Sequence, residues 1–437
     1  MIPNNLFIRN IELTNHKYFP LNKPYFDPDI ESERIITKDS SEYVRSFFSS
    51  KLRDLELRSE NNLITYIKEH YNRQHSLELD VELKKNLEEE DLSALKERYK
   101  EDVTEASFFW DQAIEFYKGT INMDVHVKPL SIYYFMLNAA KALLVYNGVL
   151  YKDRNSKNVY HGVTGLDLRN VDKQKFLVRT SEHRIIYFNE NSDLNSIQDK
   201  QIDYNFIELN ELYIQSNNGV FANLGNFFNN NIKSKEIFSL DDLISNLVFV
   251  HRAYSICKGI NIDGQLFIPL ESQCFGTHPE ENKFLYYFKI DTKYKLQTLG
   301  NIIDLTTYVS EQGNHYMIKS DQSYSNNFND IKSFILDIRQ KHQYIAGVKP
   351  RWYLMKATDC DNIKNLELNP LVILLGIFHR LSEFSRYNPL KLKNLLDSKK
   401  NETSWLLREL IENAAYQFLD LISSEITHKE FHLPRTY

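Results

Sequence analysis

Residues 129–147 read PLSIYYFMLNAAKALLVYN, and this stretch decides the helical character of the chain. Pro129 is tolerated in the first turn of a helix, and Asn147 with Gly148 can form a left-handed helix end. The residues between them are almost all apolar, and a helix that is apolar all round is buried. We therefore predict a buried central helix here.

A polar stripe interrupts this apolar helix. Ser131, Tyr134, Asn138 and Lys141 follow one another at spacings of three and four residues, which places them on one face. Buried amide and ammonium groups need partners. The stripe is either a satisfied structural network or the wall of a binding site. The structural alternative is favoured, because interior polar groups are normally paired for stability alone.

The composition outside this stretch also favours helices. The 437 residues include only 13 glycines and 11 prolines, each about half of average usage, which disfavours a turn-dense all-β fold. Hydrophobic residues make up 42% and charged residues 26%, which excludes disorder over most of the chain. Further helices are predicted from Ser41 to about Lys118, over 331–345, from Pro370 to Tyr387 after a cap at Asn369, and from about Thr403 to His428.

Alternating and Asn-rich segments predict the β structure. Residues 150–235 are expected to hold irregular strands and loops, and a helix follows from Ser239 to about Cys257. Asp263-Gly264 between alternating flanks predicts a hairpin, with further strands over 284–290 and 314–319.

The expected fold class is a predominantly helical α+β protein, in which a helical core carries a β-rich insertion and an N-terminal arm. We predict four segments: an arm and charged helices (1–120), a central helical region with irregular strands (121–258), a β-rich segment (259–325) and a C-terminal helical region packing on the central helices (326–437).

The charge balance and the cysteine content limit the possible binding partners and the possible cellular compartment. The 53 basic and 59 acidic side chains give a net charge of −6, so no global basic field attracts nucleic acid, although a local patch remains possible. Three scattered cysteines are typical of reduced thiols. The N-terminus lacks a secretion signal, and the longest apolar run, Leu371 to Phe378, is too short to span a bilayer. We expect a cytoplasmic protein without membrane contact.

The common catalytic motifs are missing. The sequence contains no G-x-G-x-x-G, no P-loop, no H-E-x-x-H and no G-x-S-x-G motif. Cys274 with His278, and His428 with His432, have the spacing of two metal ligands, whereas a structural zinc site needs four. We therefore predict no cofactor and no metal.

Two weak catalytic constellations are present. The spacing of Arg154 and His161 resembles the Arg/His motif of the helical HEPN ribonucleases, but about 1.6 such pairs are expected by chance. Asp263, Asp291 and Lys293 occur in the order of a metal-dependent, restriction-type nuclease core. The alternative for these three is solvated turn residues, since acid-x-Lys triplets are common in a charged chain.

Several segments, taken in order, resemble the YaaC-like protein family of bacterial intracellular proteins. They are Pro129-Leu130, Tyr133-Tyr134, Leu137-Asn138, Lys141-Ala142, His161-Gly162, Arg386-Tyr387-Asn388-Pro389 and the terminal helix from Trp405. Together they cover about 120–437. The arm and charged helices before them, and the β segment over about 259–325, are expected to exceed the family pattern. The resemblance implies a family and a fold, but it implies no catalysed reaction.

Four polar residues lie within these resembling segments. We hypothesise that Asn138, Lys141, His161 and Arg386 converge in one polar pocket between the central and C-terminal helices, able to hold an anion such as a phosphate or a nucleotide tail. The alternative is a buried structural network.

Two classes of function follow. The first is a non-enzymatic or accessory intracellular interaction protein, such as a component of a bacterial stress or phage-defence assembly, binding a protein partner or a second copy through residues 1–118. The second is a nuclease or nucleotide-acting effector that uses Arg154 and His161, or Asp263, Asp291 and Lys293. The missing motifs favour the first class.

Overall fold

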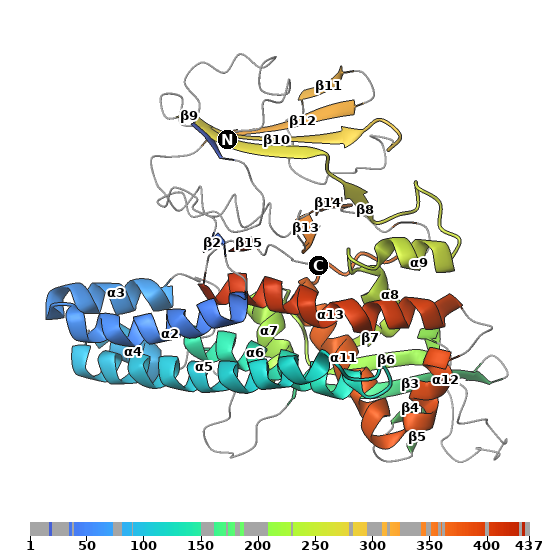
Figure 1. Cartoon of the computed structure of the whole chain (residues 1–437), viewed down its shortest axis with the longest axis horizontal. Helices are drawn as coiled ribbons and strands as arrows, with labels where there is room; N and C mark the ends of the chain where they lie inside the picture. Colours follow the sequence, from blue (N-terminus) through green and yellow to red (C-terminus); the bar gives the residue numbers. More distant parts are fainter. Residues whose placement is uncertain are drawn as a thin grey trace. The chain divides into compact units, whose positions relative to one another are not determined.

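The chain is an α+β protein in which helices predominate, and it forms two compact units (Figure 1). Unit 1 comprises 1–38, 251–367 and 428–437, and unit 2 comprises 39–250 and 368–427. The computed structural model describes residues 17–19, 35–36, 39–72, 81–89, 91–149, 161–171, 174–179, 184–187, 209–228, 230–278, 283–294, 308–312, 315–323, 342–346, 351–356, 360, 363–397, 402–427 and 431–432.

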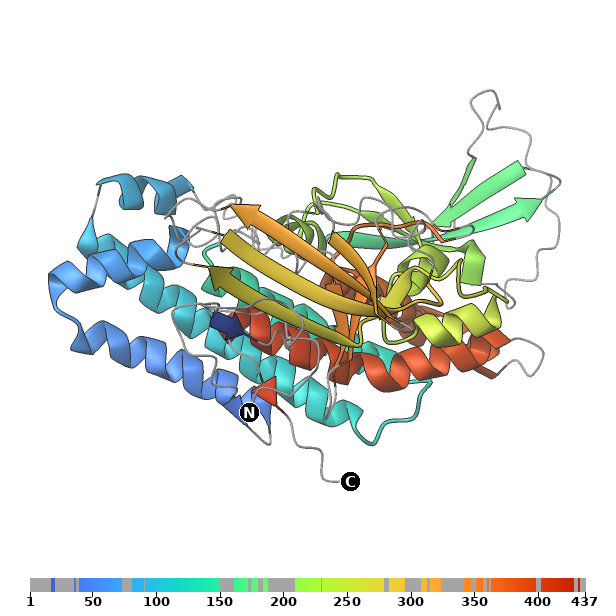
Figure 2. The ribbon, with the colours of Figure 1, turned by 90° about the horizontal axis from the view of Figure 1, so that it is seen from above.

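Long helices that lie side by side form the core of unit 2 (Figures 1 and 2). The central helix α6 packs against α5, α11, α13 and α7, while α2 packs against α5 and α13. The helices are α2 Ser40–Leu57, α3 Glu60–Asn72, α4 Val81–Glu89, α5 Leu92–Thr120, α6 Lys128–Tyr146, α7 Val220–Phe227, α8 Leu240–Ser245, α11 Pro370–Tyr387, α12 Pro389–Asp397 and α13 Glu402–Thr427.

Helix α6 confirms the predicted central helix. It begins at Lys128 with Pro129 in its first turn, and it is followed by Gly148 at φ 69°. A Cβ on Gly148 would lie 2.7 Å from a Leu83 methyl carbon, so only glycine fits this close turn. From Ser131 to Tyr146, α6 is buried except for three half-buried residues, Ser131, Tyr134 and Lys141. The polar stripe is thus the face of α6 that reaches the surface.

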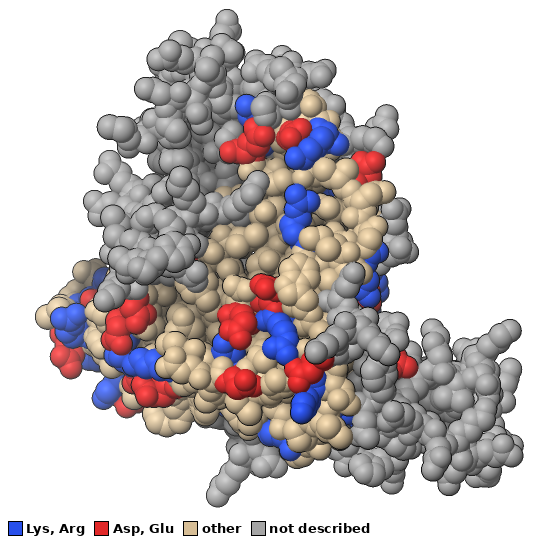
Figure 3. Space-filling model, turned by 45° about the vertical axis from the view of Figure 1, so that its right-hand side comes forward, with Lys and Arg blue, Asp and Glu red and all other residues tan. Residues whose placement is uncertain are grey.

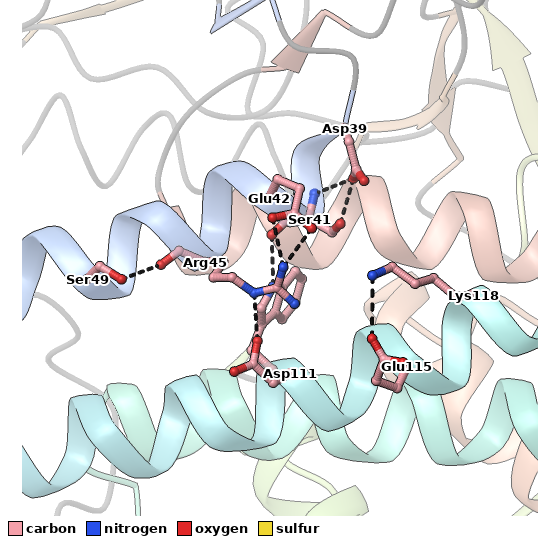
Figure 4. A network of polar contacts seen from close by, with 9 residues as sticks. Asp39, Ser41, Glu42, Arg45, Ser49, Asp111, Glu115 and Lys118 are labelled. Atoms are coloured by element: carbon pink, nitrogen blue, oxygen red, sulfur yellow. Dashed lines mark hydrogen bonds and ion pairs between the residues drawn. The ribbon is translucent and has the colours of Figure 1, made fainter.

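Polar contacts attach the N-terminal helices to this core (Figure 4). Asp39 caps α2 by accepting a hydrogen bond from the Ser41 N–H at 2.8 Å. The fully buried Trp110 on α5 donates from Nε1 to the Ser41 carbonyl at 3.0 Å. Arg45 pairs with Asp111 across the two helices at 2.8 Å. Such a surface ion pair contributes little, so the buried indole is the stronger attachment.

Unit 2 also contains a five-stranded antiparallel sheet in the order β5-β4-β3-β6-β7. Helix α11 packs on β3 and β6. The elements are β3 Val163–Val171, β4 Gln174–Arg179, β5 Arg184–Tyr187, a 3₁₀ turn at Leu209–Glu211, β6 Leu212–Ser216 and β7 Ile237–Ser239. Strands were expected here, whereas α7 was not, because its eight residues are too few to show a helical period.

Unit 1 contains the remaining sheets. One is antiparallel in the order β1-β9-β10-β12-β11, a second joins β13-β14-β8, and a parallel pair joins β15 to β2. Its elements are β1 Lys17–Phe19, β2 Ile35–Ile36, α9 His251–Cys257, β8 Phe267–Pro269, β9 Ser272–His278, β10 Lys283–Asp291, β11 Tyr308–Gln312, β12 His315–Ser323, β13 His342–Ile345, β14 Arg351–Met355 and β15 Phe431–His432.

Three local predictions are wrong. Residues 342–345 form strand β13 rather than the end of a helix, because pairing with β14 overrides local propensity; residues 331–341 lie outside the described residues. No hairpin forms at Asp263, since β8 pairs with β14 instead. The helix predicted from Ser239 to Cys257 is two helices, α8 and α9. It breaks after Asn246, whose side-chain amide donates back to the Asp242 carbonyl at 2.8 Å.

Candidate functional site

His161 directly precedes strand β3 and contacts helix α6. Its Nδ1 lies 2.8 Å from the Tyr133 hydroxyl. Tyr133 is buried, and burial raises the pKa of this phenol, so it keeps its proton and can donate to Nδ1. In the tautomer in which Tyr133 donates, a neutral His161 carries its own proton on Nε2. Since the His161 residue is exposed, it can offer this N–H to a ligand.

Arg386, in the last turn of α11, lies beside the stripe of α6. Its Nη1 donates to the Tyr134 hydroxyl at 3.4 Å, and its guanidinium carbon lies 5.2 Å from the centre of the Tyr387 ring. The buried Nε has no hydrogen-bond partner. Among the described residues, no carboxylate lies within ion-pair distance of Arg386. The described hydrogen-bond partner of Arg386 is thus a phenol.

The charges of Lys141 and Arg386 both act on His161. Although the His161 residue as a whole is exposed, partial loss of water around its imidazole lowers the pKa of His161, and the cations Lys141 and Arg386 lower it further. His161 is therefore neutral at pH 7. Two of the three side chains are linked through neighbouring tyrosines of α6: His161 bonds to Tyr133 and Arg386 bonds to Tyr134, and the ring centres of these tyrosines lie 5.6 Å apart.

A buried ion pair fixes α11 against the sheet. Arg380 is fully buried and pairs with Glu383 at 2.8 Å. Glu383 also accepts a hydrogen bond from the Gly165 N–H of β3 at 3.4 Å. A Cβ on Gly165 would lie 1.9 Å from the Glu383 carboxylate, so only glycine allows this approach. The charge of Glu383 is compensated by Arg380, which leaves that of Arg386 unbalanced on α11.

His379 lies behind this surface and was missed by sequence reasoning. Its ring centre lies 5.3 Å from that of Tyr133 and 6.3 Å from that of His161. Burial lowers the pKa of His379 to about 4, and its buried Nδ1 has no hydrogen-bond partner. Its place seven residues before Arg386 on α11 could have indicated a shared helix face.

The hypothesised polar set is brought together in part. His161 and Arg386 contact the adjacent Tyr133 and Tyr134 of α6, whereas the buried Asn138 donates from Nδ2 to the Tyr134 carbonyl of its own helix at 3.0 Å. Its amide nitrogen thus already has a partner. Whether the set encloses a binding pocket stays a prediction.

Of the weak catalytic candidates, only His161 belongs to the surface described above. Arg154 is outside the described residues, and Asp263, Asp291 and Lys293 lie in unit 1. Lys293 forms an ion pair with Asp291 at 3.2 Å and also donates its backbone N–H to that carboxylate at 2.9 Å. The main-chain carbonyl of Asp263 accepts from the Lys356 ammonium at 2.6 Å.

The described part of the chain shows neither a metal-ligand cluster nor a membrane segment. It gathers no three His, Cys, Asp or Glu side chains in a geometry that could hold a metal ion. None of its helices has both the length and the hydrophobicity that crossing a bilayer requires.

Charge is unevenly distributed over the helices that build the site. Together, α6 and α11 carry four lysines and arginines and a single carboxylate, Glu383, although the whole chain is net acidic. The face of the molecule drawn in Figure 3 instead shows acidic and basic side chains interspersed. Two of these four cations have carboxylate partners, since Lys128 pairs with Glu412 of α13 and Arg380 pairs with Glu383.

Comparison with known families gives one match. A family model described as YaaC-like Protein matches residues 56–426, which includes most of unit 2 and begins within α2. The match extends further toward the N-terminus than the resembling segments quoted above, and it also spans 259–325. The charged helices α3, α4 and α5 and the β segment, which were expected to exceed the family pattern, therefore lie within the family region. Neither the curated proteins nor the solved structures provide a match.

Proposed function

The chain belongs to the YaaC-like protein family, and on that premise we propose that unit 2 is a non-enzymatic binding module for a phosphate-bearing ligand. The observation that supports the proposal best is that Arg386 donates to the Tyr134 hydroxyl next to the Tyr133–His161 hydrogen bond. Lys141 lies on the same face of α6, two turns beyond Tyr134. We call the surface formed by Lys141, His161 and Arg386 the cation cluster.

The three side chains offer complementary donors. A guanidinium presents planar paired N–H groups that suit phosphate oxygens, and an ammonium adds a compact positive charge. The Nε2–H of a neutral His161 adds a directional hydrogen bond, because Tyr133 already occupies Nδ1. Anion binding therefore needs no change of protonation at His161.

Binding fits His161 better than catalysis does. A general base works best with a pKa near the working pH, whereas burial and the two cations lower the pKa of His161. Its described Nδ1 partner is a phenol rather than a carboxylate that would raise its basicity. The nuclease alternative would use the same histidine, so it is tested on the same variants.

The proposal is tested with inorganic tripolyphosphate as the probe, by calorimetric titration of the full chain at low salt. Arg386→Gln should weaken binding at least tenfold, since a charge-assisted hydrogen bond contributes about 1.5–3 kcal/mol. Lys118→Gln is the matched control, because Lys118 pairs with Glu115 on the exposed end of α5; it should change the affinity less than twofold.

The outcomes separate binding from catalysis. Absence of tripolyphosphate binding, or equal weakening by both variants, would overturn the proposal. In parallel, labelled RNA and DNA are incubated with the protein with and without Mg²⁺. Cleavage that is lost in His161→Ala would favour the nuclease alternative.

A binding module of this kind suits an accessory component of an intracellular assembly, including a stress or phage-defence assembly. A protein partner or a second copy held through residues 1–118 is a separate proposal. Its test is co-purification that is lost when those residues are deleted.

A further inference from the structure

Aromatic rings flank the cation cluster. Phe116 of α5 stacks on Tyr134 of α6, with ring centres 5.2 Å apart and planes 24° from parallel. The guanidinium carbon of Arg386 lies 6.0 Å from the centre of the Tyr134 ring and 5.2 Å from that of Tyr387. Tyr387 is 69% exposed and Phe116 is 38% exposed. A cation thus lies between rings that reach the solvent.

A second cation–aromatic pair lies further along the same two helices. The Lys141 ammonium is 5.1 Å from the centre of the Phe109 ring. Phe109 and Phe116 are seven residues apart on α5, as are Tyr134 and Lys141 on α6. Seven residues make two helical turns, or about 10 Å. Aromatic contacts between α5 and α6 therefore recur two turns apart, one beside Arg386 of α11 and one with Lys141 of α6, and together they form an aromatic–cation row.

This repetition distinguishes between classes of ligand. A free phosphate would engage the cations and leave the rings without a role, and an acidic peptide offers carboxylates but few flat rings. In a duplex the base faces are stacked on one another, so side chains cannot stack on them without unstacking. Single strands expose base faces and phosphates together, and proteins bind them with aromatic platforms beside basic residues.

We propose that the ligand of unit 2 is single-stranded nucleic acid. Its bases stack on Tyr387 and Phe116, while its phosphates contact Arg386 and Lys141. This inference rests on the proposed function and names its substrate class. Since stacking accepts every base, binding is sequence-tolerant.

The test uses the full chain and three fluorescein-labelled probes in anisotropy titrations: a thymidine 12-mer, an abasic 12-mer with the same phosphates, and a 12-base-pair duplex. The thymidine 12-mer should bind at least tenfold more tightly than the other two. Tyr387→Leu should weaken thymidine binding about tenfold and abasic binding less than threefold, because the abasic probe loses only the contact of this ring with Arg386. Tyr387→Phe is the matched control and should retain the affinity.

The outcomes distinguish the two proposals. Equal binding of the thymidine and abasic probes, with both weakened by Arg386→Gln, would overturn the stacking inference and leave the phosphate-binding function intact. Tightest binding of the duplex would also overturn it. If no probe binds and tripolyphosphate does not bind, both proposals fail.

Discussion

Removing the imidazole of His379 should change the pH dependence of stability in a defined direction. Burial lowers the pKa of His379 from 6.5 to about 4 in the folded state. The unfolded chain therefore binds more protons than the folded chain between these two values, and stability falls as the pH falls. Between pH 7 and pH 4.5 the loss from this residue alone is about 2.5 kcal/mol.

The substitution His379→Gln removes this titration and keeps a polar side chain. Urea unfolding is followed by tryptophan fluorescence in a Trp352→Phe background, so that the signal comes from Trp110 and Trp405 of unit 2. The free energy of unfolding of the parent minus that of the variant should decrease by about 2.5 kcal/mol from pH 7 to pH 4.5. A difference that stays constant with pH would refute a neutral, buried His379.

Three further predictions concern the surroundings of the site. Burial raises the pKa of Asp102 to about 6, so the free energy of unfolding of the parent minus that of Asp102→Asn should fall by about 2 kcal/mol as the pH rises from 4 to 7, the opposite sign to His379. Gly165→Ala places a Cβ against Glu383 and should cost about 1–3 kcal/mol in urea unfolding; an unchanged midpoint would contradict the close approach. Burial lowers the pKa of His126, but hydrogen bonds to Asp124 and Asp397 outweigh it and raise the pKa above 6.5. Asp397→Asn should lower it in an NMR titration, and no shift would argue against that contact.

The fold around the site could be predicted largely from local signals. Pro129 and Gly148 mark the two ends of α6, and Asn369 caps α11 by accepting from the Leu371 N–H at 2.9 Å. These signals lie within a few residues of the structures that they determine, so one sequence is enough to recognise them. The polar stripe of α6 could also be predicted, because residues three and four positions apart lie on the same face of any α-helix.

The site could be predicted only in part, because tertiary packing assembles it. Lys141, His161 and Arg386 were recognised as polar residues in the resembling segments, whereas the link between His161 and Tyr133 joins residues 28 positions apart and exists only in the folded chain. Sequence also assigned no partner to Glu383, since its contact with Gly165 joins distant segments. Asn138 was predicted to belong to the site, but its side chain forms a hydrogen bond with the main chain of its own helix.

The salt dependence of binding tests the central claim most directly. Each phosphate contact in a single strand contributes about −0.7 to the slope of log binding constant against log salt concentration. For the thymidine 12-mer, we predict that Arg386→Gln makes this slope less negative by about 0.7, while Lys118→Gln leaves it unchanged. An identical slope for the parent protein and Arg386→Gln would show that Arg386 contacts no phosphate, and would contradict the assignment of the cation cluster as the binding site.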